Sequence, residues 1–255
     1  MMDWPSLTLF LLITGRMTGC IVFNPLLGRR GIPGIVKAGF VLLLSLCIFP
    51  MSSLQTEMPD TLIGLSLTFL LELFLGYVLG LVMNIFFYIP LLAGGTIDMQ
   101  MGLSMGATYD PASGAQVTVT STMLNVLMSL LFFAANGHHT LIRILAVSGR
   151  VVPFGAVSLG EDLYAATIQI FIDCTILGVK LCMPILAAEL MGQVGMGILM
   201  KVIPQINVFA INIELKVIVG LTLLLLLMTP ISGFLLDAEQ EMLLSLQRVL
   251  PLMSG

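Results

Sequence analysis

Charged residues are scarce in this sequence. Only 9% of its 255 residues are Asp, Glu, Lys or Arg, whereas 58% are hydrophobic. A soluble domain normally carries charge on about a quarter of its residues, so the direct interpretation is a membrane-associated helical protein. The net charge is −4 and there is no basic patch, which argues against a nucleic-acid partner.

Paired metal-binding or disulfide motifs are also missing. The sequence contains no Cys-x-x-Cys and no matching Cys/His spacing, and it lacks the P-loop and Rossmann glycine patterns. We therefore expect no metal and no cofactor. Four cysteines lie singly inside apolar runs and are interpreted as small hydrophobic residues: Cys20, Cys47, Cys174 and Cys182.

Support for catalysis is similarly absent. Gly102–Gly106 matches G-x-S-x-G, but the α/β-hydrolase motif follows a strand, and no strand pattern precedes it here. The sequence AANGHHT is better explained by a helix break at Asn136-Gly137. We expect no enzyme activity. Two pairings would correspond to membrane proteases, and neither has a supporting motif: Ser104 with His138 or His139, and Asp98 with Asp110.

In place of these features the chain has about six long apolar stretches. No alternating ten-residue pattern of a β-barrel appears, and backbone groups in lipid must be satisfied internally, so the stretches are predicted to be helices. The fold class is all-α. Several stretches exceed one membrane thickness and are expected to be broken or to run past the bilayer. They lie near residues 5–27, 35–54, 61–93, 117–148, 162–200 and 215–236.

We treat residues 1–255 as one domain with two special segments. Residues 94–116 include QMGLSMGATYDPASGAQ, whose Gly, Ser, Asp and Pro residues interrupt the apolar pattern and predict irregular backbone that cannot face lipid. Residues 237–255 are predicted to form a short amphipathic tail.

A ridge of residues spaced by four runs along the third stretch. Such a row lies on one surface of a helix, and its small members let another helix approach closely. We interpret it as a packing surface, although glycine is also common in membrane helices for other reasons. Its members are Gly64, Thr68, Glu72, Gly76, Gly80 and Asn84, followed by Tyr88.

A polar stripe is predicted on the fifth stretch. Gln169, Asp173 and Lys180, with Asp162, fall on one face of a helix. Charges in an apolar helix face protein or water rather than lipid. Two explanations remain open: a buried pair within the chain, involving Arg16, Glu72 or Glu189, or a stripe that faces a subunit or a pore.

Four stretches of sequence, in order along almost the whole chain, resemble the flagellar export-gate family FliR. They are FNPLLGRRGIPGIVKAGF, GLSMGATYDPASGAQVTVTSTMLN, LLFFAANGHHTLI and VIPQINVFAINIELKVIVGL. The family is related to a subunit of virulence-type type III secretion systems, and PQINVFAI is more similar to the flagellar branch. Glu214 stands where flagellar relatives tend to have Pro, which puts the contacts around Lys216 in doubt.

The resemblance implies a structural role in protein export. FliR-like subunits join FliP- and FliQ-like subunits, with FlhB- and FlhA-like proteins nearby, in the bacterial inner membrane at the flagellar basal body. Unfolded export substrates pass through this gate. The chain would resemble a fusion of FliP-like and FliQ-like helical units, partly covered by partners and partly by lipid.

The resemblance also implies that the central segment lies at the pore and helps to plug it. Methionines are flexible enough to seal around varied cargo, and glycines permit a mobile backbone. The simpler alternative is an ordinary re-entrant connector. For the whole chain, the alternatives are a virulence-type subunit or a small-solute transporter or channel. The plug residues are Met99, Met101, Gly102, Met105, Gly106, Asp110, Pro111 and Gly114.

Overall fold

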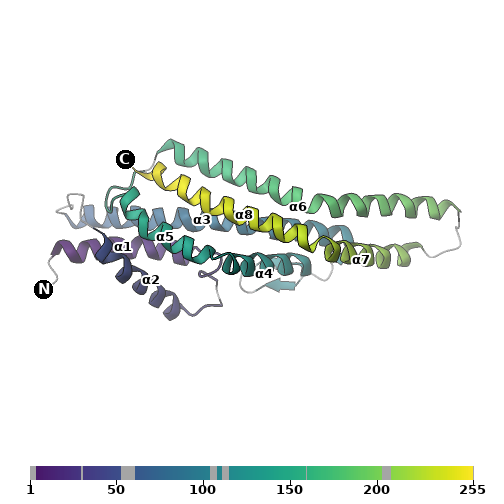
Figure 1. Ribbon diagram of the computed structural model, residues 1–255, viewed down its shortest axis with the longest axis horizontal. Helices are drawn as coiled ribbons and strands as arrows, with labels where there is room; N and C mark the ends of the chain where they lie inside the picture. The colour runs from purple at the N-terminus through teal and green to yellow at the C-terminus, as the bar shows by residue number, and fades with distance from the viewer. Residues whose placement is uncertain are drawn as a thin grey trace. The chain divides into compact units, whose positions relative to one another are not determined.

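The computed structural model describes residues 4–29, 31–52, 61–103, 108–110, 115–158, 160–202 and 208–254 (Figure 1). Most of these residues are helical, which confirms the all-α prediction. The helices are α1 (Trp4–Val22), α2 (Gly34–Ile48), α3 (Leu62–Met101), α4 (Val119–Ala134), α5 (Gly137–Val151), α6 (Glu161–Val202), α7 (Val208–Leu226) and α8 (Met228–Val249), with 3-10 turns η1 (Phe49–Met51) and η3 (Leu250–Met253).

The described residues also include two short paired strands, which the sequence did not predict. Strands β1 (Thr108–Asp110) and β2 (Ala115–Val117) pair antiparallel, with Thr108 opposite Val117. The two strands lie between α3 and α4, so part of this segment has regular backbone.

Within the described residues, four helices are long and apolar enough to cross a membrane, or up to six spans if each bent pair is counted as one. This agrees with the apolar stretches that the sequence predicted. The pair α4–α5 bends by 67° at the predicted break, where Asn136 adopts a left-handed φ of 59°. The pair formed by α7 and α8 bends by 62°.

Two predicted boundaries differ from the structure. Residues 94–101 were expected to be irregular, but α3 continues to Met101, because Ala93, Ile97 and Met101 are buried at helical spacing. The helix stops at Gly102, whose φ of 79° suits a residue without a side chain.

The predicted tail at 237–255 is not a separate element. It continues α8, which begins at Met228 and carries an uninterrupted buried stripe through Ile231, Leu235, Met242 and Leu246. Pro251 follows the helix, inside η3.

The chain divides into two compact units. The first consists of residues 1–86, 136–172 and 239–255. Its core lies where α1 packs against α2 and α3, and it includes the fully buried Ile13, Met17 and Leu75. The end of the chain is fixed within this unit, because Ser158 N–H donates to the Met253 carbonyl at 3.0 Å.

The second unit consists of residues 87–135 and 173–238. Its core includes Met101, Leu124, Met128 and Ile185. In this unit α7 contacts both α6 and α3, because a Cβ placed on Gly220 would meet Glu189 and overlap the Met101 thioether.

Candidate functional site

A fully buried arginine is the centre of the first unit's polar contacts. Arg16 on α1 places its Nε 2.6 Å from the Glu72 Oε2 on α3. Its Nη1 donates to the Ser148 hydroxyl on α5 at 3.1 Å, and its Nη2 donates to the Val152 carbonyl at 3.0 Å. Both charged side chains have 0% solvent exposure, so the cluster connects three helices inside the protein.

The connection after α5 completes this cluster. The Phe154 ring centroid lies 4.2 Å from the guanidinium carbon of Arg16, in a cation–π contact. The Gly155 N–H donates to the other carboxylate oxygen of Glu72 at 2.8 Å. Arg16 and Glu72 thus satisfy each other, so neither serves as the partner that one of the two explanations offered for the polar stripe on α6.

Four residues of the predicted ridge lie together where α3 meets α1 and Phe23, the residue after α1. Glu72 binds Arg16, and a Cβ on Gly76 would overlap the Arg16 carbonyl oxygen. A Cβ on Gly80 would lie 2.9 Å from the Phe23 carbonyl, and the Asn84 side-chain amide donates to that same carbonyl. The small residues are therefore placed where two backbones approach each other.

The remaining ridge residues lie elsewhere. Gly64 and Thr68 are half-buried, and the Thr68 hydroxyl donates to the Gly64 carbonyl of its own helix at 3.1 Å. Tyr88 is exposed. Among the ridge residues, the described contacts to α1 and Phe23 thus belong to those from Glu72 to Asn84, while the neighbouring Phe69 meets α1 at Gly15.

The polar stripe is not buried in this chain, which corrects that part of the prediction. Gln169, Asp173 and Lys180 are all exposed on α6. The helix turns its small and apolar residues inward instead: Cys174, Gly178 and Leu181 are buried. The helical spacing was identified correctly, but spacing alone does not say which face of a helix packs inside.

The candidate plug residues lie only partly within the described residues. Met99 is 71% exposed, whereas Met101 is fully buried. Gly102 forms the turn out of α3, and Asp110 ends β1. Met105, Gly106, Pro111 and Gly114 lie outside the residues that the structure describes, as does Ser104 of the G-x-S-x-G match.

The sequence did not predict the polar contact beside this segment. Asp98 on α3 is fully buried, and its two oxygens accept hydrogen bonds from the backbone and hydroxyl of Thr120 on α4, at 2.8 and 2.5 Å. A charge within an apolar run, followed by TVTST at the next helix start, is the signal that could have identified it.

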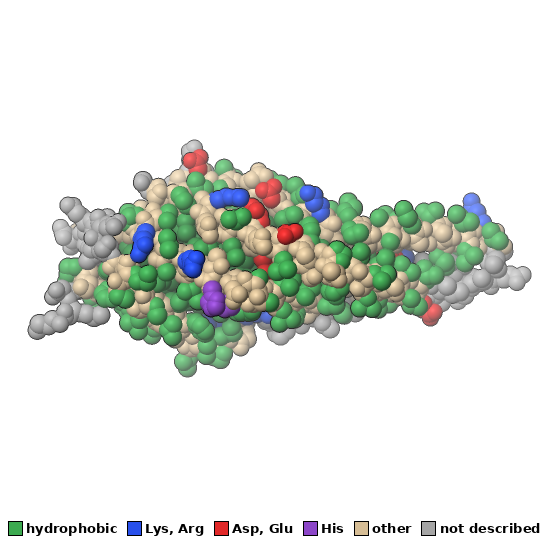
Figure 2. Space-filling view, viewed as in Figure 1, with side chains coloured by type: hydrophobic (Ala, Val, Ile, Leu, Met, Phe, Trp, Pro, Cys, Tyr) green, Lys and Arg blue, Asp and Glu red, His purple; other side chains and the backbone are tan. Residues whose placement is uncertain are grey.

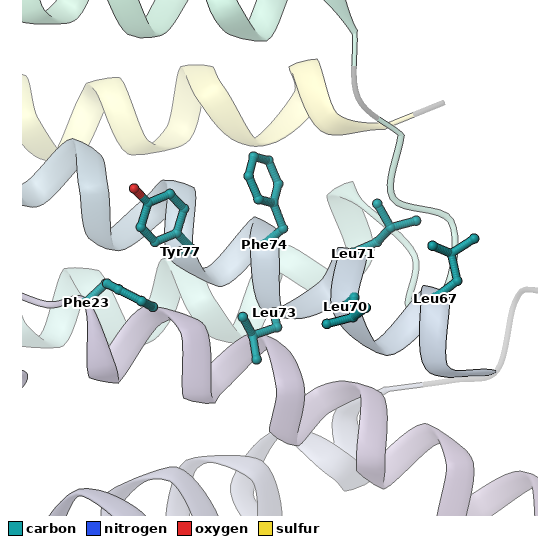
Figure 3. Close-up of a pocket in the computed structure, with 7 residues that line it drawn as sticks. All are labelled: Phe23, Leu67, Leu70, Leu71, Leu73, Phe74 and Tyr77. Atoms are coloured by element: carbon teal, nitrogen blue, oxygen red, sulfur yellow. The ribbon is translucent and has the colours of Figure 1, made fainter. Parts of the chain in front are cut away.

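An apolar hollow of about 390 Å³ lies on the outer side of α3 in the first unit (Figure 3). Phe23, at the end of α1, forms one wall and meets Tyr77 edge-on, with ring centroids 4.6 Å apart. Leu67 and Leu70 are more than half exposed. Hydrophobic side chains also cover much of the face shown in Figure 2, so this chain keeps extensive apolar surface.

The sequence model of a family described as "Bacterial export proteins, family 1" matches residues 7–242. The chain belongs to this family. Flagellar biosynthetic protein FliR of Pectobacterium carotovorum is 30% identical over 204 residues, which cover 78% of this chain and 76% of that protein. FliR of Escherichia coli is 29% identical over 214 residues, covering 84% and 81%.

Relatives with a different name match the chain over a similar length. Yop proteins translocation protein T of Yersinia pestis is 27% identical over 217 residues, covering 83% of this chain and 82% of that protein. The resemblance to FliR that the sequence motifs predicted is therefore confirmed, together with its link to type III secretion.

Proposed function

We propose that this chain is a structural, non-enzymatic subunit of the flagellar type III protein export gate. In this role it joins FliP- and FliQ-like subunits in the inner membrane of the flagellar basal body, beside FlhB- and FlhA-like proteins. Unfolded flagellar proteins would leave the cytoplasm through the resulting channel. Family membership over residues 7–242, with relatives named FliR, is the observation that carries the proposal.

The outer face of α6 supports a protein partner. In the second unit, Asp173 and Lys180 are exposed beside exposed Ile176, Val179 and Met183. Charged residues within a helix of membrane-spanning length are costly against lipid and face protein or water. Exposed apolar residues beside them favour a neighbouring subunit over open water.

The decisive experiment combines purification with export. The tagged chain, extracted gently from its own membranes, should co-purify with FliP- and FliQ-like proteins, and its deletion should abolish secretion of flagellar proteins and motility. A chain that is monodisperse alone, binds neither protein and leaves flagellar secretion intact on deletion would refute the proposal. Secretion of virulence proteins in its place would support the virulence-type alternative.

We further propose that the connection between α3 and α4 lies in the channel and obstructs it at rest. The resemblance to FliR supports this, as do the exposed Met99 and the turn at Gly102. Deleting residues within Gly106–Gly114 should leave assembly intact and let ions or small solutes leak across the membrane. A deletion that assembles, stays tight and exports normally would make the segment an ordinary connector.

A further inference from the structure

The first turn of α4 is capped by a side chain from another helix. Its own N-cap residue, Thr118, makes no side-chain bond to the backbone of that turn, and its hydroxyl lies 3.0 Å from the Ser121 hydroxyl instead. Asp98 of α3 takes over the role, accepting the Thr120 N–H at 2.8 Å and the Thr120 hydroxyl at 2.5 Å. Unpaired N–H groups at a helix start need such an acceptor.

Electrostatics explains why a carboxylate is tolerated at this position. Asp98 has 0% exposure, and a buried charge is costly unless it is compensated. The N-terminus of a helix carries about half a positive elementary charge, so α4 compensates Asp98 while Asp98 caps α4. Each partner therefore depends on the other for a satisfied arrangement.

Further contacts hold the end of α3 on both sides. The Ser121 hydroxyl donates to the Leu91 carbonyl at 3.0 Å, and a Cβ on Gly94 would overlap the Ser121 backbone. On the α7 side, the side chain of Met101 occupies the space that a Cβ on Gly220 would need. The last turns of α3 thus contact two helices, while Met99 stays exposed.

We propose that Asp98 is a positioning residue. It holds the start of α4 against the end of α3, and so fixes both ends of the segment that connects these two helices. By binding Thr120 it sets where α4 begins and keeps that start on α3. The inference rests on the proposed function, in which this connection obstructs the channel. Loss of Asp98 would then release the start of α4 and loosen the obstruction, without removing any residue of the connection itself.

Three variants separate tethering from capping. Asp98→Ala removes both acceptors. Asp98→Asn keeps an acceptor for the Thr120 N–H and can donate to its hydroxyl. Asp98→Ala combined with Thr118→Asp supplies a cap from within α4 but leaves α4 untethered. The readouts are amide exchange at Thr120 in the full chain, complex abundance, and leakage of small solutes in cells.

We expect Asp98→Ala to speed exchange at Thr120 by about tenfold or more and to cause leakage at normal complex abundance. Asp98→Asn should resemble the wild type. The double variant should regain slow exchange yet still leak. If its leakage also disappears, Asp98 is only a helix cap and the inference is refuted. If Asp98→Ala does not accumulate, Thr120→Val is the substitute, because it removes only the hydroxyl donor. It should show smaller changes in the same direction. A Thr120→Val membrane that does not leak refutes the inference.

The Gly106–Gly114 deletion distinguishes this inference from the proposed function. If the deletion leaks while Asp98→Ala assembles and stays tight, the positioning role is refuted and the obstruction stands. If the deletion itself stays tight, the obstruction is refuted. In that case the positioning role is refuted with the obstruction, and faster exchange at Thr120 in Asp98→Ala shows only that Asp98 caps α4.

Discussion

Removing either charge of the Arg16–Glu72 pair should destabilise the first unit strongly. Arg16→Met leaves the Glu72 carboxylate buried with one remaining donor, the Gly155 N–H. Glu72→Leu leaves the Arg16 guanidinium with the Ser148 hydroxyl and the Val152 carbonyl, and with no counter-charge. In each case an uncompensated charge stays inside a fully buried site.

The expected magnitudes differ between the single and double variants. Breaking a buried pair by removing one partner costs about 3–5 kcal/mol, whereas replacing both partners by apolar residues is often nearly neutral. Here the double variant also strands the Gly155 N–H and the Val152 carbonyl, at about 1–3 kcal/mol for each buried group left unpaired. The losses in unfolding free energy of the two single variants should therefore not add. The double variant should be at least as stable as the less stable of the two single variants.

The assay is the free energy of unfolding of the full chain in detergent micelles, measured for all four members of the cycle. The exposed pair between Arg248 and Glu241, at 2.8 Å, provides the matched control. Exposed pairs contribute about 0–1 kcal/mol, so Arg248→Met should change little. Additive losses in the buried cycle, or single losses no larger than that of Arg248→Met, would refute the reasoning.

Two further predictions concern packing and the α6 surface. Gly76→Ala should lower the folded yield, because its Cβ would overlap the Arg16 carbonyl. Gly39→Ala is the control: the space around Gly39 is open, so this change should be neutral or stabilise α2 by up to about 1 kcal/mol. Equal yields of the two variants would contradict the ridge packing. Lys180→Leu should change the stability of the isolated chain by about 0.5 kcal/mol or less, because the side chain is exposed. In the assembled complex the same change should lower thermal stability if a subunit covers α6, and an unchanged melting profile would place Lys180 in water.

The sequence predicted helices well because hydrophobic length is a strong signal. The six apolar stretches correspond to the long helices and bent pairs. The boundaries at 94 and 237 were missed because contacts decide them. Gly94 and Gly95 weaken a helix in isolation, but the contacts of Asp98 and Met101 in the folded chain keep α3 helical to its end.

The candidate site was less predictable than the fold. Spacing by four identified Gly76 and Gly80, and both lie at a close approach of two backbones. The same row of residues spaced by four also contains Tyr88, which is exposed, so spacing alone does not show which members meet another helix. Only the position of a second helix separates these cases, and that position depends on residues far away in the sequence.

The fate of the charged residues on the long apolar helices shows how this chain depends on its surroundings. Arg16 and Glu72 satisfy each other within the first unit, and in the second unit Asp98 is compensated by the start of α4. Lys180, on a helix equally long and apolar, lies exposed instead. Because a charge on such a helix is costly against lipid, the compensation of Arg16, Glu72 and Asp98 comes from the chain itself, whereas the exposed Lys180 is left to water or to a neighbouring protein.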